Sequence, residues 1–166
     1  MNLEKYDAFI EEQKNYFNQN LQSNFKWDWN DSSWYGGTIG SGWLLSRSGK
    51  THFTFGTIKK LKGIENNNID PVFQEFIKSV LILSYRKSNS KASPQKLYSE
   101  FLILKRWFSA LYTESTDNVH PCQLSTSILN KSFEILVENS SKTNLPDHAG
   151  TYLRLQEMLN HYGITE

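Results

Sequence analysis

Two pairs of a capping residue and a proline mark helix starts in the second half of the chain, and they constrain the fold most. Asp70-Pro71 and Ser93-Pro94 each place an N-cap side chain before a proline that suits the first helical turn. Apolar residues at helical spacing follow both pairs. The sequence therefore predicts helices over about 71–87 and about 94–113.

The same spacing predicts three further helices. One covers residues 3–21 and carries acidic residues on the face opposite its apolar stripe. The other two cover about 124–139 and about 147–162. Gly163 follows the last of them and is expected to end it as a C-cap glycine.

Residues 24–62 have a different pattern, which favours strands. Phe25, Trp27 and Trp29 alternate with polar residues, as in a half-buried strand. Trp43-Leu44-Leu45 and residues 51–57 have strand-like composition and are separated by the turn signal Ser48-Gly49. We therefore expect an antiparallel sheet of about three strands packed on the first helix, since two strands alone would be marginal.

The polar stretch 63–70, with three consecutive asparagines, predicts a linker between two domains. A chain of 166 residues suffices for one full domain or two small ones. The expected fold class is α+β. A small N-terminal domain, residues 1–62, would hold the first helix and the sheet, and residues 71–166 would form an all-α bundle of four helices.

Composition excludes several classes of protein. The formal net charge is +1, so attraction to a polyanion would have to be local. Cys122 is the single cysteine, which precludes an internal disulfide, and the four histidines are scattered without metal-ligand spacing. No apolar run approaches the roughly 18 residues of a membrane span. We expect a soluble cytoplasmic protein that uses no metal, cofactor, membrane or small-molecule substrate.

Motifs of known catalytic or nucleotide-binding sites are incomplete in this chain. Ser48-Gly49-Lys50-Thr51 resembles the end of a phosphate-binding loop, but Leu44 stands where that loop requires a glycine. Cys122 lacks the surroundings of a nucleophile, and we interpret it as a free, partly buried thiol. No catalytic residue is assigned.

Tryptophans allow two interpretations. Those in the sheet region, Trp27, Trp29, Trp34 and Trp43, could stack on bases or sugars, but core packing is the favoured interpretation. Trp107, in the helix 94–113, is expected to pack inside.

Basic residues gather in and around the helix 94–113, and Glu100 is the one acid among them. They are Arg86, Lys87, Lys91, Lys96, Lys105 and Arg106. A cationic helix in a balanced domain is typical of a surface that grips nucleic-acid phosphates, although a solvated helix face has the same composition. Lys96 and Lys105 are nine positions apart and must lie on different faces, so part of the cluster cannot serve one groove.

Residues 71–164 also show a recognisable order of segments. A first helix leads into a basic polar turn, an aromatic-rich capped helix, a variable helix and a last helix behind a Ser/Lys/Thr-rich loop. These segments are Phe76–Lys87, Ser88–Ser93, Leu97–Phe108, Leu124–Glu138, Ser140–Thr143 and Thr151–Leu155. The order resembles the core-binding domain of tyrosine recombinases, the phage-type integrases, which is a SAM-like helical domain preceding their catalytic domain.

The resemblance implies one half of a clamp around double-stranded DNA, with self-association on DNA left open. Because the family's catalytic residues lie in a separate domain, we expect this chain to be a fragment without enzymatic activity. The expected DNA contacts combine basic side chains with backbone amides at capped helix starts. They are Lys87, Lys91, Ser93, Lys96, Lys105, Arg106, Lys142, Thr143 and Arg154.

Two other functions remain open at the level of sequence. A protein-interaction adaptor would have an exposed apolar patch and no DNA affinity. A small enzyme could use the Gly/Trp-rich region as a ligand pocket, but no acid–base pair or nucleophile can be assigned to it.

Overall fold

The computed structural model describes residues 3–20, 28–36, 51–56, 69–88, 96–105 and 120–138, and residues 149–150, 153–154, 156–157, 160–161 and 163. Its elements are α1 (Leu3–Asn20), β1 (Ser33–Gly36), β2 (Thr51–Thr54), α2 (Pro71–Lys87), the 3-10 turn η2 (Pro121–Gln123) and α4 (Thr126–Glu138). Residues 96–105 and most of the described residues from 149 to 161 are also helical. Among these helices, none is both long and apolar enough to cross a membrane.

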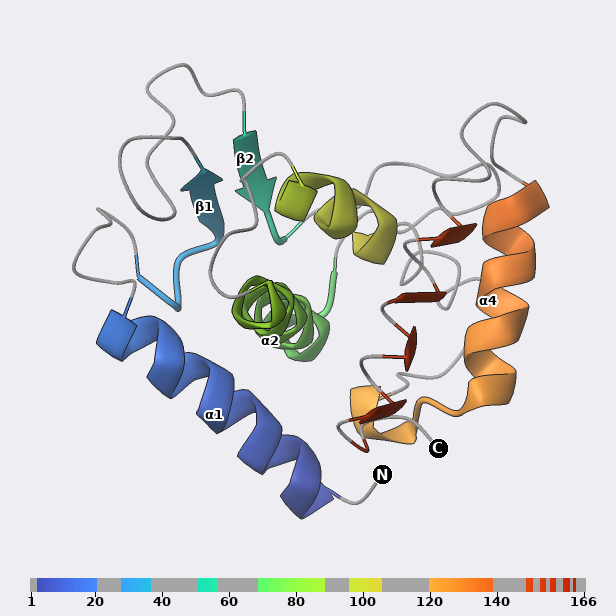
Figure 1. Ribbon diagram of the computed structural model, residues 1–166, viewed down its shortest axis with the longest axis horizontal. Helices are drawn as coiled ribbons and strands as arrows, with labels where there is room; N and C mark the ends of the chain where they lie inside the picture. Colours follow the sequence, from blue (N-terminus) through green and yellow to red (C-terminus); the bar gives the residue numbers. More distant parts are fainter. Residues whose placement is uncertain are drawn as a thin grey trace.

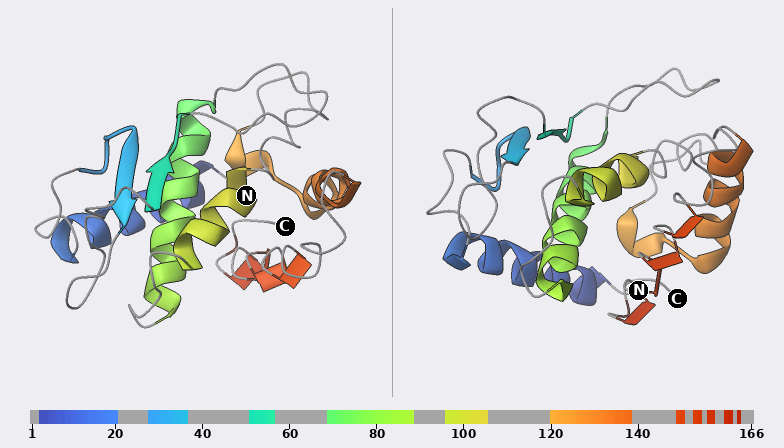
Figure 2. Two further views of the ribbon diagram at one scale, coloured as in Figure 1. Left: turned by 90° about the horizontal axis from the view of Figure 1, so that it is seen from above. Right: turned by 45° about the horizontal axis from the view of Figure 1, so that its top comes forward.

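Helix α2 occupies the centre of the fold. Figure 1 shows it nearly end-on, with α1, the strand pair and the helical residues 96–105 arranged around it, and Figure 2 shows the same arrangement from two other directions. Every residue from Phe76 to Tyr85 is buried, including those on opposite faces of the helix. A helix buried on all sides must be surrounded by other elements, because a surface helix buries only one stripe.

Strands β1 and β2 form an antiparallel pair beside α2. Ser33 pairs with Thr54 and Gly36 with Thr51, which sets Trp34 opposite Phe53. Both of these aromatic side chains are fully buried. The pair therefore contributes its large rings to the core, which supplies the hydrophobic support that an isolated two-stranded sheet lacks.

A chain of aromatic rings connects α1, the sheet and residues 96–105. The ring of Phe17 in α1 stacks on Trp34, with centroids 5.0 Å apart, and Trp34 meets Phe55 edge-on at 4.9 Å. Phe55 in turn contacts Phe101 at 5.4 Å. Aromatic pairs in these geometries add stability beyond the area they bury. Trp29 and Trp34 belong to this core, which confirms the packing interpretation for these two; Trp27, Trp43 and Trp107 lie outside the described residues.

The predicted fold class is wrong. Within the described residues the protein is mostly helical, its sheet has two strands, and no separate four-helix bundle is formed. The bundle prediction grouped the helix 71–87 only with the helices that follow it in the chain. Val80-Leu81-Ile82-Leu83 is instead a continuous apolar run that requires neighbours on every side, and α1 and the sheet provide them.

The strand expected around Trp29 is replaced by a turn. The Asp28 carboxylate accepts a hydrogen bond from the Asn30 amide (2.8 Å), and the Asp31 carboxylate accepts one from the Asp28 amide (2.9 Å). Such local bonds from aspartate side chains stabilise turns against extended structure. Strand β1 consequently begins only at Ser33, and the expected strand Trp43-Leu44-Leu45 lies outside the described residues.

Individual helices were predicted more accurately than their assembly. Helices α1, α2 and α4 confirm the helices expected over 3–21, 71–87 and 124–139. Gly163 has a φ of 65°, as expected of a C-cap glycine. One core cluster includes side chains from both sides of the stretch 63–70, most of which lies outside the described residues, so the division into 1–62, 63–70 and 71–166 stays a prediction.

Candidate functional site

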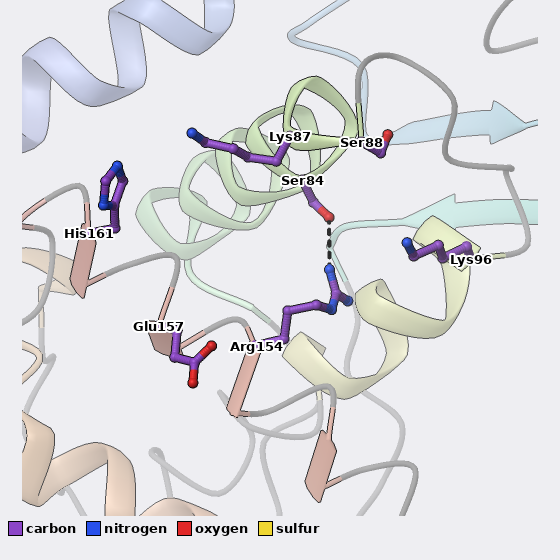
Figure 3. Close-up of a pocket in the computed structure, with 7 residues that line it drawn as sticks. All are labelled: Ser84, Lys87, Ser88, Lys96, Arg154, Glu157 and His161. Atoms are coloured by element: carbon purple, nitrogen blue, oxygen red, sulfur yellow. Dashed lines mark hydrogen bonds between the residues drawn. The ribbon is translucent and has the colours of Figure 1, made fainter.

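A pocket of about 410 Å³ opens where three parts of the fold meet. Its walls are the C-terminal end of α2, the start of the helical residues 96–105, and the helical residues between 149 and 161 (Figure 3). The described side chains that line it are Ser84, Lys87, Ser88, Lys96, Arg154, Glu157 and His161. The lining is thus composed of charged and polar groups drawn from distant parts of the sequence.

Helical spacing brings the lining residues of each element to one side. On α2, Lys87 and Ser88 follow Ser84 by three and four positions. On the last helical segment, Glu157 and His161 follow Arg154 by three and seven positions. Helix α2 ends at the pocket, where the Ser88 hydroxyl donates a hydrogen bond to the Tyr85 carbonyl oxygen (2.6 Å). Local helix geometry therefore presents two polar faces, and tertiary packing sets them opposite each other.

A buried carboxylate, Glu100, holds these faces together. Its residue is only 1% exposed. The Ser84 hydroxyl donates to Glu100 Oε2 (2.5 Å), the Arg154 guanidinium pairs with Glu100 Oε1, and Arg154 Nη1 donates to the Ser84 hydroxyl oxygen (3.4 Å). A buried carboxylate is stable only with a counterion and hydrogen bonds. The ion pair with Glu100 therefore fixes the position of the Arg154 side chain.

The charge of the pocket is predominantly positive. Lys87 and Lys96 stand on two of its walls and Arg154 on the third, whereas Glu157 is the one acidic side chain among the described lining residues. Figure 3 shows the Arg154 guanidinium between Ser84 and Lys96. Guanidinium and ammonium groups are the side chains that suit a phosphate, which accepts several charge-assisted hydrogen bonds at once.

The structure brings together three of the nine predicted contact residues and separates a fourth from them. Lys87, Lys96 and Arg154 meet at the pocket. Lys105 points away from it, where its ammonium donates to the Thr54 carbonyl oxygen (2.9 Å), and burial lowers the pKa of Lys105. The expected difference in facing between Lys96 and Lys105 is therefore confirmed. The remaining predicted residues, Lys91, Ser93, Arg106, Lys142 and Thr143, lie outside the described part of the chain.

Sequence reasoning missed the role of Glu100, although a signal was present. Leu97, Phe101 and Leu104 form the buried stripe of the helix 94–113, and Glu100 lies within that stripe, three positions after Leu97. An acid inside an apolar stripe indicates a buried carboxylate that needs a cationic partner. The partner itself, Arg154, is 54 positions away and carries no local signal.

Other candidate groups do not assemble into a site. Thr51 opens strand β2, so the helix required by a phosphate-binding loop at residues 48–51 does not follow. Cys122 is partly buried and forms no disulfide, as expected, and its sulfur lies 2.9 Å from His120 Nδ1. Within the described residues no group of three or more His, Cys, Asp or Glu side chains could hold a metal ion.

Comparison with known proteins identifies no relative. No protein-family model matches the chain, and neither the curated proteins nor the solved structures contain a significant match. The function must therefore be argued from the pocket itself.

Proposed function

We propose that this protein binds double-stranded DNA through the phosphate backbone at the Ser84–His161 pocket. The observation that supports the proposal is the convergence of Lys87, Lys96 and Arg154, which the sequence pattern had singled out separately as phosphate contacts. These residues span 68 positions, yet their side chains line one pocket. Each lysine that neutralises a phosphate releases condensed counterions and so favours binding at low salt.

The lining chemistry supports contact with the backbone rather than with base edges. The described lining residues include no Asn or Gln to pair with an adenine edge, and no Phe, Tyr or Trp to stack on a base. Phosphate contacts position a protein on a duplex without carrying sequence information. Binding through phosphate contacts alone would be independent of sequence.

Removal of the two lysines tests the proposal. We expect Lys87→Gln with Lys96→Gln to weaken binding of a fluorescently labelled duplex. The slope of log Kd against log salt should become shallower by about two, because each phosphate that a lysine neutralises contributes roughly 0.9 to that slope. Fluorescence anisotropy over a salt series measures both quantities.

Lys131→Gln provides the matched control, because Lys131 is an exposed lysine of α4 and does not line the pocket. Equal losses in the control and in the double variant would mean that the attraction is diffuse, which would refute a site at this pocket.

A protein-interaction adaptor is the second candidate. The observation that favours it is that two predicted DNA contacts, Lys105 and Arg154, bond to groups of the protein itself. An adaptor would show no salt-dependent affinity for duplex DNA.

The recombinase assignment stays a prediction, since it relied on a four-helix bundle that the described residues do not form. A DNA partner together with a single cysteine fits the proposed cytoplasmic location.

A further inference from the structure

We infer that the buried carboxylate of Glu100 promotes DNA binding, because it holds the guanidinium of Arg154 in the orientation that receives a backbone phosphate. The inference rests on the proposed function and adds a positioning residue to it. A carboxylate that acted by its charge alone would have the opposite effect, since it would repel the phosphates.

Two bonds on different nitrogens fix the guanidinium. Arg154 Nη2 pairs with Glu100 Oε1, and Arg154 Nη1 donates to the Ser84 hydroxyl oxygen (3.4 Å). The Ser84 hydroxyl in turn donates to Glu100 Oε2 (2.5 Å), so both carboxylate oxygens are engaged. Because a guanidinium is planar, contacts through two of its nitrogens set the plane of the whole group.

The partners of Arg154 belong to the core. Ser84 is 4% exposed and Glu100 is 1% exposed, and they lie on two different helical segments. Their neighbours Leu83 and Phe101 are buried as well, and side chains in a closely packed interior have little freedom to reorient. The orientation of the guanidinium is therefore set by buried groups.

The same guanidinium remains accessible to a ligand. The Arg154 side chain is 43% exposed, and its bonds to Ser84 and Glu100 engage two of the five N–H donors of the group. Figure 3 shows it beside Ser84 at the open pocket. A phosphate that accepts from the remaining donors would meet a side chain that is already ordered, which reduces the entropy lost on binding.

Charge and orientation have opposite effects on binding in this ion pair. Arg154 and Glu100 together carry no net charge, so loss of the Glu100 charge alone would favour a polyanion. Repulsion between Glu100 and a phosphate is weakened by the paired guanidinium and by solvent. The bond from an oriented guanidinium to a phosphate is short and charge-assisted, so we expect the loss of orientation to prevail.

Glu100→Gln tests the inference, because glutamine has nearly the same shape but one acceptor oxygen in place of two. We expect it to weaken binding of a labelled duplex about fivefold, somewhat less than the tenfold equivalent of one charge-assisted hydrogen bond. Fluorescence anisotropy measures the affinity, and urea denaturation establishes that each variant is folded under the conditions of the titration.

Glu157→Gln is the matched control. It makes the same chemical change in an acid that lines the pocket, and Figure 3 draws no hydrogen bond between Glu157 and Arg154. We expect this variant to tighten binding about twofold, because it removes a repulsive charge and disturbs no bond of the guanidinium. Weaker binding in the control would refute the distinction between orientation and charge.

The Arg154→Gln background separates positioning from a general structural role. Glu100→Gln should no longer weaken binding there, because no guanidinium is left to orient. An equal loss of affinity in both backgrounds would overturn the inference, since it would mean that Glu100 acts through the fold as a whole.

The remaining outcomes distinguish this inference from the proposed function. Unchanged or tighter binding by Glu100→Gln, with the dependence on Lys87 and Lys96 retained, would overturn the inference and leave backbone binding intact. Absence of duplex binding by the native protein would overturn both.

Discussion

Lys78 carries its ammonium group into the core of the protein. The residue is 4% exposed, and its Nζ donates to the carbonyl oxygens of Trp29 (2.5 Å) and Asp31 (2.9 Å). The same nitrogen lies 5.5 Å from the ring centroid of Trp34 and 5.0 Å from that of Phe55. Lys78 thereby ties the turn before β1 to the central helix, with hydrogen bonds and aromatic faces replacing part of its lost hydration.

Burial of this ammonium makes stability depend on pH. Burial lowers the pKa of Lys78 from 10.5 to about 8, and the nearby carboxylates of Glu75, Asp31 and Asp28 oppose the change only in part. Between these two pH values the unfolded chain holds a proton that the folded chain has released. The free energy of unfolding must therefore rise with pH across this window.

We expect this rise to disappear in Lys78→Met. From pH 8 to 10.5 the unfolding free energy of the native protein should increase relative to the variant by up to about 3 kcal/mol, the equivalent of the pKa difference. Urea denaturation at a series of pH values measures it. Parallel curves for the two proteins would show that Lys78 titrates normally in the fold.

At the scale of the element, α2 combines a strong local start with burial on all sides. The Asp70 carboxylate accepts a hydrogen bond from the Val72 amide (2.9 Å), and Pro71 occupies the first turn. These features need no tertiary contact, because an N-cap satisfies a backbone donor that the helix itself leaves open. The buried run from Phe76 to Tyr85 then makes the helix the scaffold for α1, the strand pair and the helical residues 96–105 (Figure 1).

Asp70→Ala should destabilise the protein by about 1 kcal/mol, the usual contribution of an N-cap side chain. Asp70→Ser retains an oxygen acceptor and should restore most of the loss. The midpoint of urea denaturation, at unchanged slope, reports the difference. An alanine variant as stable as the native protein would show that the cap contributes nothing.

At the scale of the whole molecule, the contacts of Glu100 join three separate segments. Its bonds to Ser84 and Arg154 connect the helical residues 96–105 to α2 and to the last described helical segment. The Arg154 side chain is 43% exposed, so solvent screens the pair and moderates its contribution. The same contacts that seat the last segment also shape the pocket.

Arg154→Ala should destabilise the fold by about 2 kcal/mol, because it leaves a buried carboxylate without its counterion. Glu100→Gln removes that charge, so the double variant should be less destabilised than the sum of the two single variants. Denaturation of all four proteins in a double-mutant cycle measures the coupling. Strict additivity would mean that the two side chains do not interact in solution.

Features that depend on interactions between neighbouring residues could be predicted from the sequence, and features that depend on distant contacts could not. The positions of α1, α2 and α4 were predicted because caps and apolar periodicity act within a few residues. The turn at Asp28 was missed because alternation around Trp29 imitates a strand until the aspartate side chains bond to the backbone. The fold class was wrong because periodicity reports which face is apolar and not what covers it.

Prediction of the candidate site was limited in the same way. Both Lys96 and Lys105 were predicted as contacts because they are basic. In the folded protein Lys96 lines the pocket, whereas Lys105 donates a hydrogen bond to the Thr54 carbonyl oxygen. Burial of Glu100 could have been predicted, because it is an acid within an apolar stripe. Its pairing with Arg154 could not, because that depends on how distant helices pack. Residue type thus suggests a chemistry, and its location depends on the fold.

By itself, the amino-acid sequence determined where the main helices begin and end, because capping and helical periodicity are satisfied within one or two turns of chain. Tertiary structure alone decided that α2 is central and that Lys87, Lys96 and Arg154 meet. The physical reason is that a long apolar run and a buried carboxylate can be stabilised only by partners far away in the chain. Glu100 thereby holds the Arg154 side chain at the pocket.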